Sequence, residues 1–315
     1  MSALVAELAG RLALLDGMPD LGAGAPSPED IARFDGFFAP VGDYRAPTAV
    51  VEEHVAPGPH GPVPVRVYRP ADHPAAPVGL VWMHGGAFIS GDRDMPEADV
   101  VARELASRVG ATVVSVDYRL CHGGVHFPVP HDDVHAAFAW AATASDLLPA
   151  GAPWAIGGAS AGANLALGVA QRLRDEGGPA ASAVLLAYPV VHDPVPAGSP
   201  ELALRMATLP SVLRFTPEAT RFLNRNYLGP HPASVPYAFP GDGRLEGLPP
   251  TVVSLCEYDD LLPSGERLVA DLRAAGVTVV EDAATGAPHG HLNVPGLPAA
   301  LASLGVMSEH LRRTS

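Results

Sequence analysis

Short apolar runs alternate with amphipathic stretches over most of this chain. The runs are rich in Val, Ile and Leu, which is typical of strands buried on both faces of a sheet. They predict strands at residues 50–55, 63–68, 78–83, 111–116, 154–158, 182–187, 251–256 and 276–281. The stretches between them predict helices at 97–109, 132–145, 161–176, 265–275 and 298–312. The alternation predicts an α/β fold with a mostly parallel, eight-stranded sheet covered by helices on both faces.

Two stretches lie outside this alternation, residues 1–45 and 192–240. We expect both to form one helical cap, and residues 46–191 and 241–315 to form the main α/β core. The second stretch carries apolar residues among prolines. Of these, Leu209 and Phe215 are our candidates for contact with a substrate.

The N-terminal stretch has leucines near helical spacing, at Leu4, Leu8, Leu12 and Leu15. Glu7 and Arg11 fall on another face. This pattern predicts an amphipathic helix, which we interpret as a lid or packing element and not as a membrane anchor.

The segment Gly158-Ala159-Ser160-Ala161-Gly162 lies between a predicted strand and a predicted helix. It has the Gly-x-Ser-x-Gly pattern of a nucleophile elbow, in which a serine occupies a strained strand-to-helix turn. Glycine is needed on both sides because a side chain there would collide with the neighbouring strand and helix. Alone the match is weak, since Ala, Gly and Ser are abundant in this chain. It makes Ser160 a candidate nucleophile, placed where helix N–H groups favour negative charge.

Glycines also follow the strand at 78–83, in His84-Gly85-Gly86. N–H groups without side-chain obstruction suit an oxyanion hole, and the residue after the nucleophile commonly adds a third donor. We therefore expect the donors to be Gly85, Gly86 and Ala161; the plainer alternative is a flexible turn. The residues expected to contact substrate beside them are His84, Ala87 and Phe88.

A candidate acid and a candidate base follow two later strands. Asp259 and Asp260 come after the strand at 251–256, and His289 lies in the loop after the strand at 276–281. Spacing alone leaves both aspartates open, but neighbouring side chains alternate faces along a strand, so both cannot point at His289. The plainer alternatives are a helix cap for the acid and a solvated loop histidine. The order Ser160, Asp259, His289 is that of the α/β-hydrolase triad.

Over residues 60–315 the chain resembles the hormone-sensitive-lipase-like family of bacterial esterases within the α/β-hydrolase fold. The matching motifs lie at His84-Gly85-Gly86, 116–120, 158–165, Tyr188-Pro189, 236–240, Glu257-Tyr258-Asp259 and His289-Gly290. The resemblance implies that Ser160 is the nucleophile, His289 the base and Asp259, directly after Glu-Tyr, the acid.

Several positions depart from the family pattern. Ala87 replaces the usual third glycine, Asp260 stands where proline is usual, and 121–126 replaces the usual Ala-Pro-Glu. We expect such changes to alter the pocket and not the triad.

The resemblance implies a serine carboxylesterase that hydrolyses short-to-medium acyl esters through an acyl-enzyme, with no cofactor. One alternative is a lactonase, amidase or deacetylase with the same triad, acting on a specialised metabolite. Another is a non-catalytic small-molecule binder. Plant gibberellin receptors are binders of this kind: they resemble the family but lack the histidine. That histidine is present here as His289.

Composition narrows the chemistry. The chain has 315 residues, is 48% hydrophobic and carries a formal net charge of −14. Such a charge argues against binding nucleic acid through its phosphates. All 20 basic residues are arginine. The absence of lysine excludes a Schiff base, a Ser-Lys dyad and a phosphate-loop lysine, so a seryl acyl transfer needs histidine as its base.

The sequence indicates no metal site, no membrane contact and no disulfide framework. His131 and His135, beside Asp132 and Asp133, could bind a metal, but no third ligand is evident and we expect none. No apolar run is long enough to span a bilayer, and the N-terminus lacks the basic residues of a secretory signal. With two cysteines only, we expect a cytoplasmic protein that acts on a small ester; the family resemblance also allows a homodimer.

Overall fold

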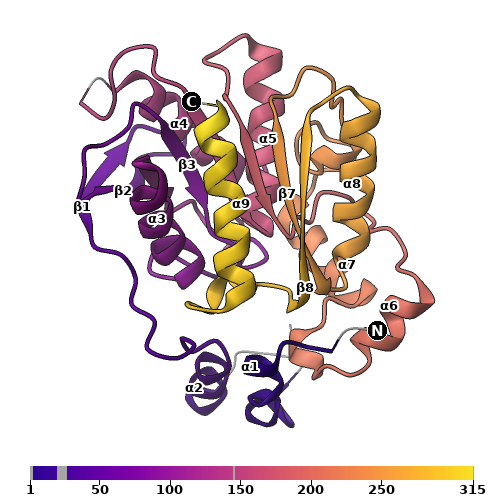
Figure 1. Cartoon of the computed structure of the whole chain (residues 1–315). Helices are drawn as coiled ribbons and strands as arrows, with labels where there is room; N and C mark the ends of the chain where they lie inside the picture. The colour runs from indigo at the N-terminus through magenta and orange to yellow at the C-terminus, as the bar shows by residue number, and fades with distance from the viewer. Residues whose placement is uncertain (1–2, 20–26, 145, 315) are drawn as a thin grey trace.

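The computed structural model describes residues 3–19, 27–144 and 146–314 of the chain. In these residues eight strands form one sheet in the order β1-β2-β4-β3-β5-β6-β7-β8 (Figure 1). β2 pairs antiparallel with both β1 and β4, and every later pair of neighbours is parallel. The prediction of a mostly parallel, eight-stranded sheet is therefore confirmed.

All eight predicted strands are present. They are β1 Ala49–Ala56, β2 Val63–Pro70, β3 Gly79–Met83, β4 Thr112–Val116, β5 Trp154–Ala159, β6 Val184–Ala187, β7 Thr251–Tyr258 and β8 Val279–Pro288. The largest error concerns β8, which was expected at residues 276–281. It starts later and continues to Pro288 because backbone pairing with β7 extends through residues that form no apolar run. His289 therefore follows the strand directly.

The five predicted core helices are also present, as α3 Pro96–Val109, α4 Val129–Thr143, α5 Ala161–Glu176, α8 Leu262–Ala274 and α9 Pro298–Thr314. The predicted end of α4 at Ser145 lies outside the described residues. Other helices are α1 Ala6–Ala9, α2 Pro28–Phe37, α6 Pro200–Met206 and α7 Pro217–Leu228, with 3₁₀ turns η1 Leu12–Leu15, η2 Ser211–Leu213, η3 Pro240–Asp242 and η4 His291–Asn293.

The continuous N-terminal amphipathic helix was a wrong prediction. The structure divides the leucine-rich stretch into the short α1 and the 3₁₀ turn η1, with Gly10 at the end of α1. Glycine is a poor helix former, which favours a break there. Leu8 and Leu15 are nevertheless buried, so the apolar pattern did identify packing residues.

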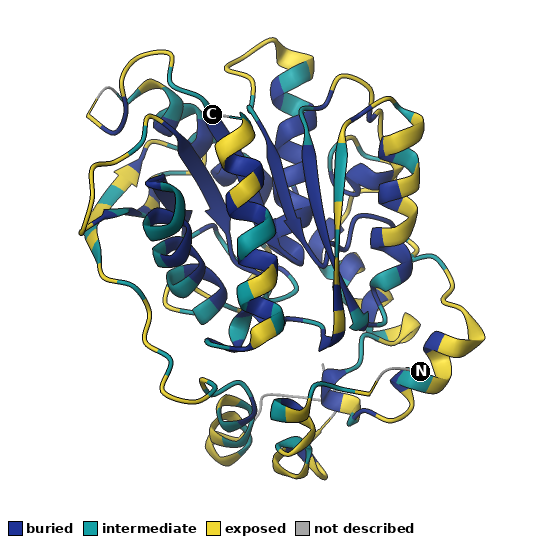
Figure 2. Cartoon of the chain, viewed as in Figure 1, coloured by how far each residue is buried: buried dark blue, intermediate teal, exposed yellow. Residues whose placement is uncertain are grey.

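Apolar side chains fill both faces of the sheet. Phe138 of α4, Leu167 of α5 and Leu268 of α8 belong to the cluster on one face. Leu105 of α3 and Met307 of α9 belong to the cluster on the other. Figure 2 shows the central strands buried and the outer faces of the helices exposed. Burial on both faces explains why these strands are continuously apolar.

The two stretches outside the alternation, residues 1–45 and 192–240, both lie near the carboxyl ends of the parallel strands. In Figure 1, α1 and α2 lie below the lower ends of the strands, and α6 lies to the right of the lower ends of β7 and β8. Leu8 and Phe37 belong to the same apolar cluster as Leu202 and Met206 of α6. Residues 1–2 and 20–26 of the first stretch lie outside the described part, and the division into a core and a cap stays a prediction.

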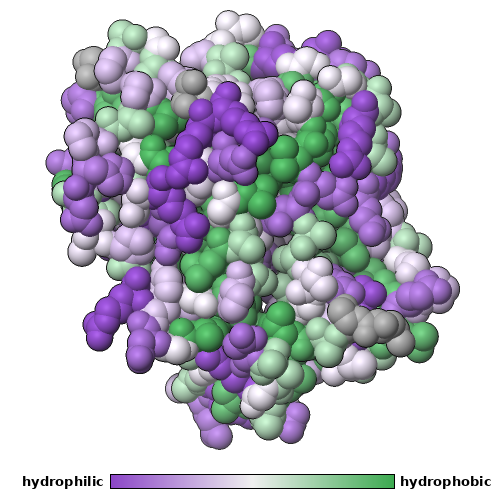
Figure 3. Space-filling model, viewed as in Figure 1, coloured by the Kyte–Doolittle hydropathy of each residue, from purple (hydrophilic) through white to green (hydrophobic). Residues whose placement is uncertain are grey.

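Across the ranges described above, no helix has both the length and the apolar character needed to cross a lipid bilayer. The face drawn in Figure 3 intersperses hydrophobic and hydrophilic residues.

Two fully buried histidines lead to a prediction about acid stability. Burial lowers the pKa of His131 to about 4, and burial together with the nearby His289 lowers the pKa of His291 to about 3. In the unfolded chain each of these histidines has an ordinary pKa of about 6.5. Below that pH the unfolded chain therefore binds protons that the folded protein does not. We expect the free energy of unfolding to fall by about 1 kcal/mol per pH unit for each histidine as pH drops from about 6.5 towards 4.

Urea unfolding at several pH values measures this slope. His131→Met should flatten it, and His122→Gln, at an exposed histidine, should not. An unchanged slope in His131→Met would contradict the assignment.

Candidate active site

Ser160 lies at the sharp turn between β5 and α5. Its backbone has φ of 75° and ψ of −107°, a conformation that residues with a side chain rarely adopt. The flanking glycines are sterically required. A Cβ on Gly158 would lie 2.5 Å from the carbonyl oxygen of Gly162, and a Cβ on Gly162 would lie 2.5 Å from that of His84. The turn thus holds the serine hydroxyl at the carboxyl ends of the parallel strands.

Ser160, His289 and Asp259 form a continuous hydrogen-bonded chain. The Ser160 hydroxyl lies 2.9 Å from Nε2 of His289, and Nδ1 of His289 lies 2.7 Å from Oδ2 of Asp259. The carboxylate of Asp259 is nearly fully buried and also accepts the N–H of Leu261. Since a carboxylate only accepts, Nδ1 carries the proton and Nε2 can accept one from the serine.

Two aromatic rings pack on the imidazole of His289. The ring of Tyr188 has its centroid 4.8 Å away, and that of Phe215 has its centroid 4.6 Å away. Tyr188 follows β6 and Phe215 follows η2, so the histidine is held between the core and the inserted segment.

Asp260 points to a different partner. Its carboxylate binds the guanidinium of Arg214 at 2.8 and 3.0 Å and accepts the N–H of Phe215 at 2.9 Å. The two aspartates thus diverge, although both follow Tyr258, the last residue of β7. A helix-capping role for the second acid is not what the structure shows.

The predicted set of oxyanion donors needs a correction. The N–H of Gly85 donates to Oε1 of Glu97 at 2.6 Å, so it is not directed to the pocket. Gly86 and Ala87 line the pocket beside Ser160, and both have positive φ. Ala161 follows the serine at the first position of α5, where helix N–H groups lack intrahelical partners.

The buried side chain of Glu97 holds the loop that contains Gly85 and Gly86. The residue is 2% exposed, and its second oxygen accepts the hydroxyl hydrogen of Tyr188 at 2.8 Å. Burial and the charge of Glu97 raise the pKa of Tyr188 well above its usual range. Glu97 therefore joins the glycine loop to a ring that packs on His289.

A pocket of about 570 Å³ opens at Ser160 and His289. Part of its wall comes from both stretches outside the strand–helix alternation. These stretches contribute Phe34, Phe38 and Pro40 at the N-terminal side and Val212, Leu213, Phe215 and Leu223 from the insertion. Ile89, Met95 and Pro295 add apolar lining from the core. Among the described residues that line it, Asp35 and Glu97 carry charge and none is an arginine.

Of the five residues predicted to contact substrate, two lie at the pocket, and their contact with substrate stays a prediction. Ala87 and Phe215 line the pocket. His84 does not, because its buried ring stacks on Tyr118 at 4.5 Å between ring centroids.

Phe88 and Leu209 also lie away from the pocket. Phe88 is buried and stacks on Tyr227 at 3.8 Å, and Leu209 packs into the apolar cluster on the α3 side of the sheet. Side-chain direction in irregular segments could not be obtained from the hydrophobic pattern.

The sequence analysis named no residue of the N-terminal stretch as part of the pocket. Phe34 and Phe38 belong to α2 and to the residue at its end. A local signal was present, because Ser27 and Asp30 form a capping box with Pro28 at the first helical position. That signal predicts the helix, whereas its position at the pocket of Ser160 depends on tertiary packing.

His131 and His135 do not come together with a third ligand. His135 pairs with Glu176 at 3.1 Å, and Asp132 pairs with Arg172 at 2.7 Å. The part of the chain that the structure describes contains no group of three or more His, Cys, Asp or Glu side chains placed to hold a metal ion.

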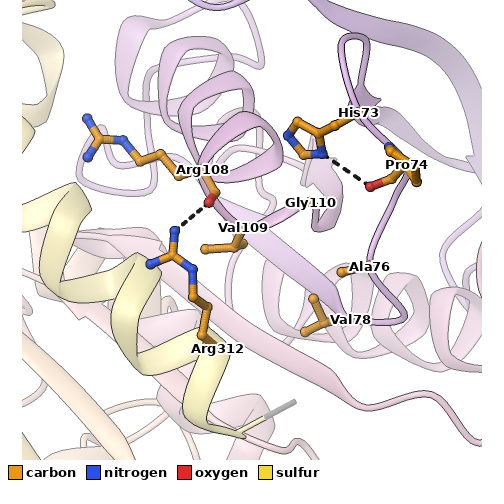
Figure 4. A pocket seen from close by; sticks show the side chains of 8 residues that line it. All are labelled: His73, Pro74, Ala76, Val78, Arg108, Val109, Gly110 and Arg312. Atoms are coloured by element: carbon orange, nitrogen blue, oxygen red, sulfur yellow. Dashed lines mark hydrogen bonds between the residues drawn. The ribbon is translucent and has the colours of Figure 1, made fainter.

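A second hollow, of about 350 Å³, lies at the amino-terminal ends of β3 and β4, whereas Ser160 lies at the carboxyl ends of the strands. Its lining includes His73, Arg108 and Arg312 (Figure 4). Arg312 donates to the carbonyl of Arg108, and His73 lies 3.1 Å from that of Pro74. None of its lining side chains is a hydroxyl, thiol or carboxylate, so it holds no candidate nucleophile or acid.

Comparison with known proteins adds a family. A family model described as alpha/beta hydrolase fold matches residues 80–293. Esterase LipI of Mycobacterium tuberculosis is 35% identical over 257 residues, which are 77% of this chain and 75% of LipI. Arylacetamide deacetylase of Bos taurus is 30% identical over 291 residues, covering 73% of this chain and 72% of the relative.

A solved structure of an esterase from Pyrobaculum calidifontis superposes with a TM-score of 0.75 at 34% identity. The match covers 85% of this chain and 86% of the esterase. The predicted α/β-hydrolase fold is thereby confirmed.

Proposed function

We propose that this chain, which belongs to the hormone-sensitive-lipase-like family of α/β hydrolases, cleaves short-to-medium acyl esters. The reaction proceeds through an acyl-enzyme on Ser160. The chain is a carboxylic ester hydrolase. The observation that carries the mechanism is the hydrogen-bonded chain from Ser160 through His289 to Asp259.

In the first half-reaction, the Ser160 oxygen attacks the ester carbonyl carbon while Nε2 of His289 takes the hydroxyl proton. Asp259 holds the imidazole in the required tautomer and stabilises the imidazolium. The tetrahedral intermediate collapses, its C–O bond to the alcohol breaks, and His289 returns the proton to the departing alkoxide.

The second half-reaction repeats these steps with water. His289 takes a proton from water, the resulting hydroxide attacks the acyl carbon, and the bond to Ser160 breaks as the serine recovers its proton. The products are a carboxylic acid and free enzyme.

We assign the oxyanion hole to the N–H groups of Gly86, Ala87 and Ala161. This assignment rests on the commitment of the Gly85 N–H to Glu97 and on the position of Gly86 and Ala87 at the pocket. Such donors stabilise the charge that develops on the carbonyl oxygen.

A fluorophosphonate probe tests the proposal directly, because it forms a covalent bond only with an activated serine. We expect stoichiometric labelling of Ser160, located by peptide mass spectrometry. Absence of labelling in a folded sample would support a non-catalytic binder instead.

Acyl-chain length provides a further prediction. The pocket has a volume of about 570 Å³ and is lined by Phe34, Phe38 and Phe215, which suits a small ester better than a long chain. We expect kcat/KM for p-nitrophenyl butyrate to exceed that for the palmitate ester by roughly a hundredfold. Steady-state kinetics below the micelle concentration measure the ratio, and a higher value for palmitate would contradict the esterase interpretation in favour of a lipase.

Amide hydrolysis is a second candidate because one relative is named an arylacetamide deacetylase. The same nucleophile and base would serve, with the protonated amine as leaving group. A matched pair, phenyl acetate and acetanilide, separates the two activities because only the leaving atom differs.

We also propose a reducing compartment, such as the cytoplasm, because Cys121 and Cys256 are both free thiols in the buried interior. β8 is the last strand at one side of the sheet and has a neighbour on one side only. Two copies could pair there or through α9, and this homodimer stays a prediction.

A further inference from the structure

Asp260 occupies a position where the family resemblance leads one to expect proline, and here it makes a defined set of contacts. It accepts two hydrogen bonds from the guanidinium of Arg214, at 2.8 and 3.0 Å, and one from the backbone N–H of Phe215. The Arg214 and Asp260 side chains are 22% and 14% exposed. A forked, partly desolvated pair of this kind fixes orientation more firmly than a surface ion pair.

Arg214 also secures the segment that precedes it. Its Nη1 donates to the carbonyl of Met206 at 2.9 Å, at the end of α6. A second arginine, Arg205 of α6, donates to the carbonyl of Glu257 at 2.8 Å. Two arginines of the insertion thus bind residues on either side of Asp259, Arg205 at Glu257 near the end of β7 and Arg214 at Asp260 just after it.

Phe215 follows Arg214 directly and packs on the imidazole of His289 at 4.6 Å between ring centroids. It also lines the pocket. In the proposed mechanism His289 delivers its proton to the departing alcohol, so a side chain packed on this imidazole borders the alcohol side of the substrate and not the acyl side.

We propose that Asp260 and Arg214 form a latch that positions Phe215 as a wall of the alcohol subsite. This inference rests on the proposed function of Ser160 and His289. Asp260 and Arg214 are positioning residues, since they act through Phe215. The latch limits the size of the alcohol group and leaves acyl-chain preference unchanged.

The test compares acetates that differ only in their alcohol. Phenyl acetate and 1-naphthyl acetate have the same acyl group and differ by one aromatic ring. In Arg214→Ala we expect kcat/KM for phenyl acetate to fall about tenfold, mainly through KM. The ratio of kcat/KM for the naphthyl over the phenyl ester should rise roughly fivefold. The ratio between p-nitrophenyl acetate and butyrate should stay within about twofold of wild type.

A double-mutant cycle separates the latch from general loss of stability. Arg214→Ala, Asp260→Ala and the double variant should change the naphthyl-to-phenyl ratio by the same factor, because the second substitution removes nothing further. Arg221→Ala is the matched control. Arg221 is an exposed arginine of α7 that forms no ion pair with another described residue, and its variant should match wild type.

An unchanged naphthyl-to-phenyl ratio in folded Arg214→Ala overturns the proposal, and so do additive effects or an equal shift in acyl preference. If Arg214→Ala does not fold, Phe215→Leu replaces it, with the same expected rise in the ratio and the same overturning result. Ser160→Ala is assayed in parallel. Turnover that persists in that variant rejects the proposed function itself, which is a different outcome from loss of the latch alone.

Discussion

Ser160→Ala is expected to abolish hydrolysis of p-nitrophenyl acetate and butyrate, lowering kcat by a factor on the order of 10⁶. The substitution removes the only atom that forms the acyl bond in the proposed mechanism. Stopped assays at high enzyme concentration measure the residual rate, with hydrolysis by contaminating esterases excluded by fluorophosphonate pretreatment.

The fold of Ser160→Ala should persist. The backbone N–H of this residue donates to the carbonyl of Ala187 at 2.9 Å whatever the side chain, and the hydroxyl makes one hydrogen bond, to His289. Losing that bond costs about 1 kcal/mol. A melting temperature within about 5 °C of wild type is the control. Retention of a tenth of the wild-type rate would place the nucleophile elsewhere.

Asp259→Asn is expected to lower kcat by a factor on the order of 10³–10⁴. Asn presents an N–H donor as well as an oxygen, so it no longer obliges Nδ1 of His289 to carry the proton. The tautomer with its proton on Nε2 cannot accept from Ser160. The 2.7 Å hydrogen bond between His289 and a 1% exposed carboxylate makes this dependence strong.

Asp260→Asn is the matched comparison, because it changes the same group on the adjacent residue. It should cost no more than about tenfold in kcat/KM, since the Asn oxygen can still accept the N–H of Phe215. Steady-state kinetics of the two variants decide between the acids. A larger loss in Asp260→Asn would overturn the assignment of Asp259.

The sequence by itself determined the sheet, its covering helices and the candidate triad. Buried strands and amphipathic helices are local patterns, and each candidate catalytic residue lies within a few positions of a strand end. The glycines around Ser160 indicated a crowded turn, and the structure gives the contacts that a Cβ would meet. The sequence also led us to expect that only one of Asp259 and Asp260 reaches His289. The strand alternation behind that expectation does not apply, because β7 ends at Tyr258 and the two side chains diverge in the loop after it.

Only the tertiary structure decided which groups surround that triad. The N–H of Gly85 is taken by Glu97, 12 positions further along the chain. Phe34 reaches the pocket from α2, and Asp260 binds Arg214 across 46 positions. Hydrophobic periodicity carries no information about such contacts, because it reports which face of an element is buried and not which distant side chain covers it. The triad could therefore be predicted from strand ends, whereas the oxyanion donors and the walls of the pocket depend on how separate segments pack together.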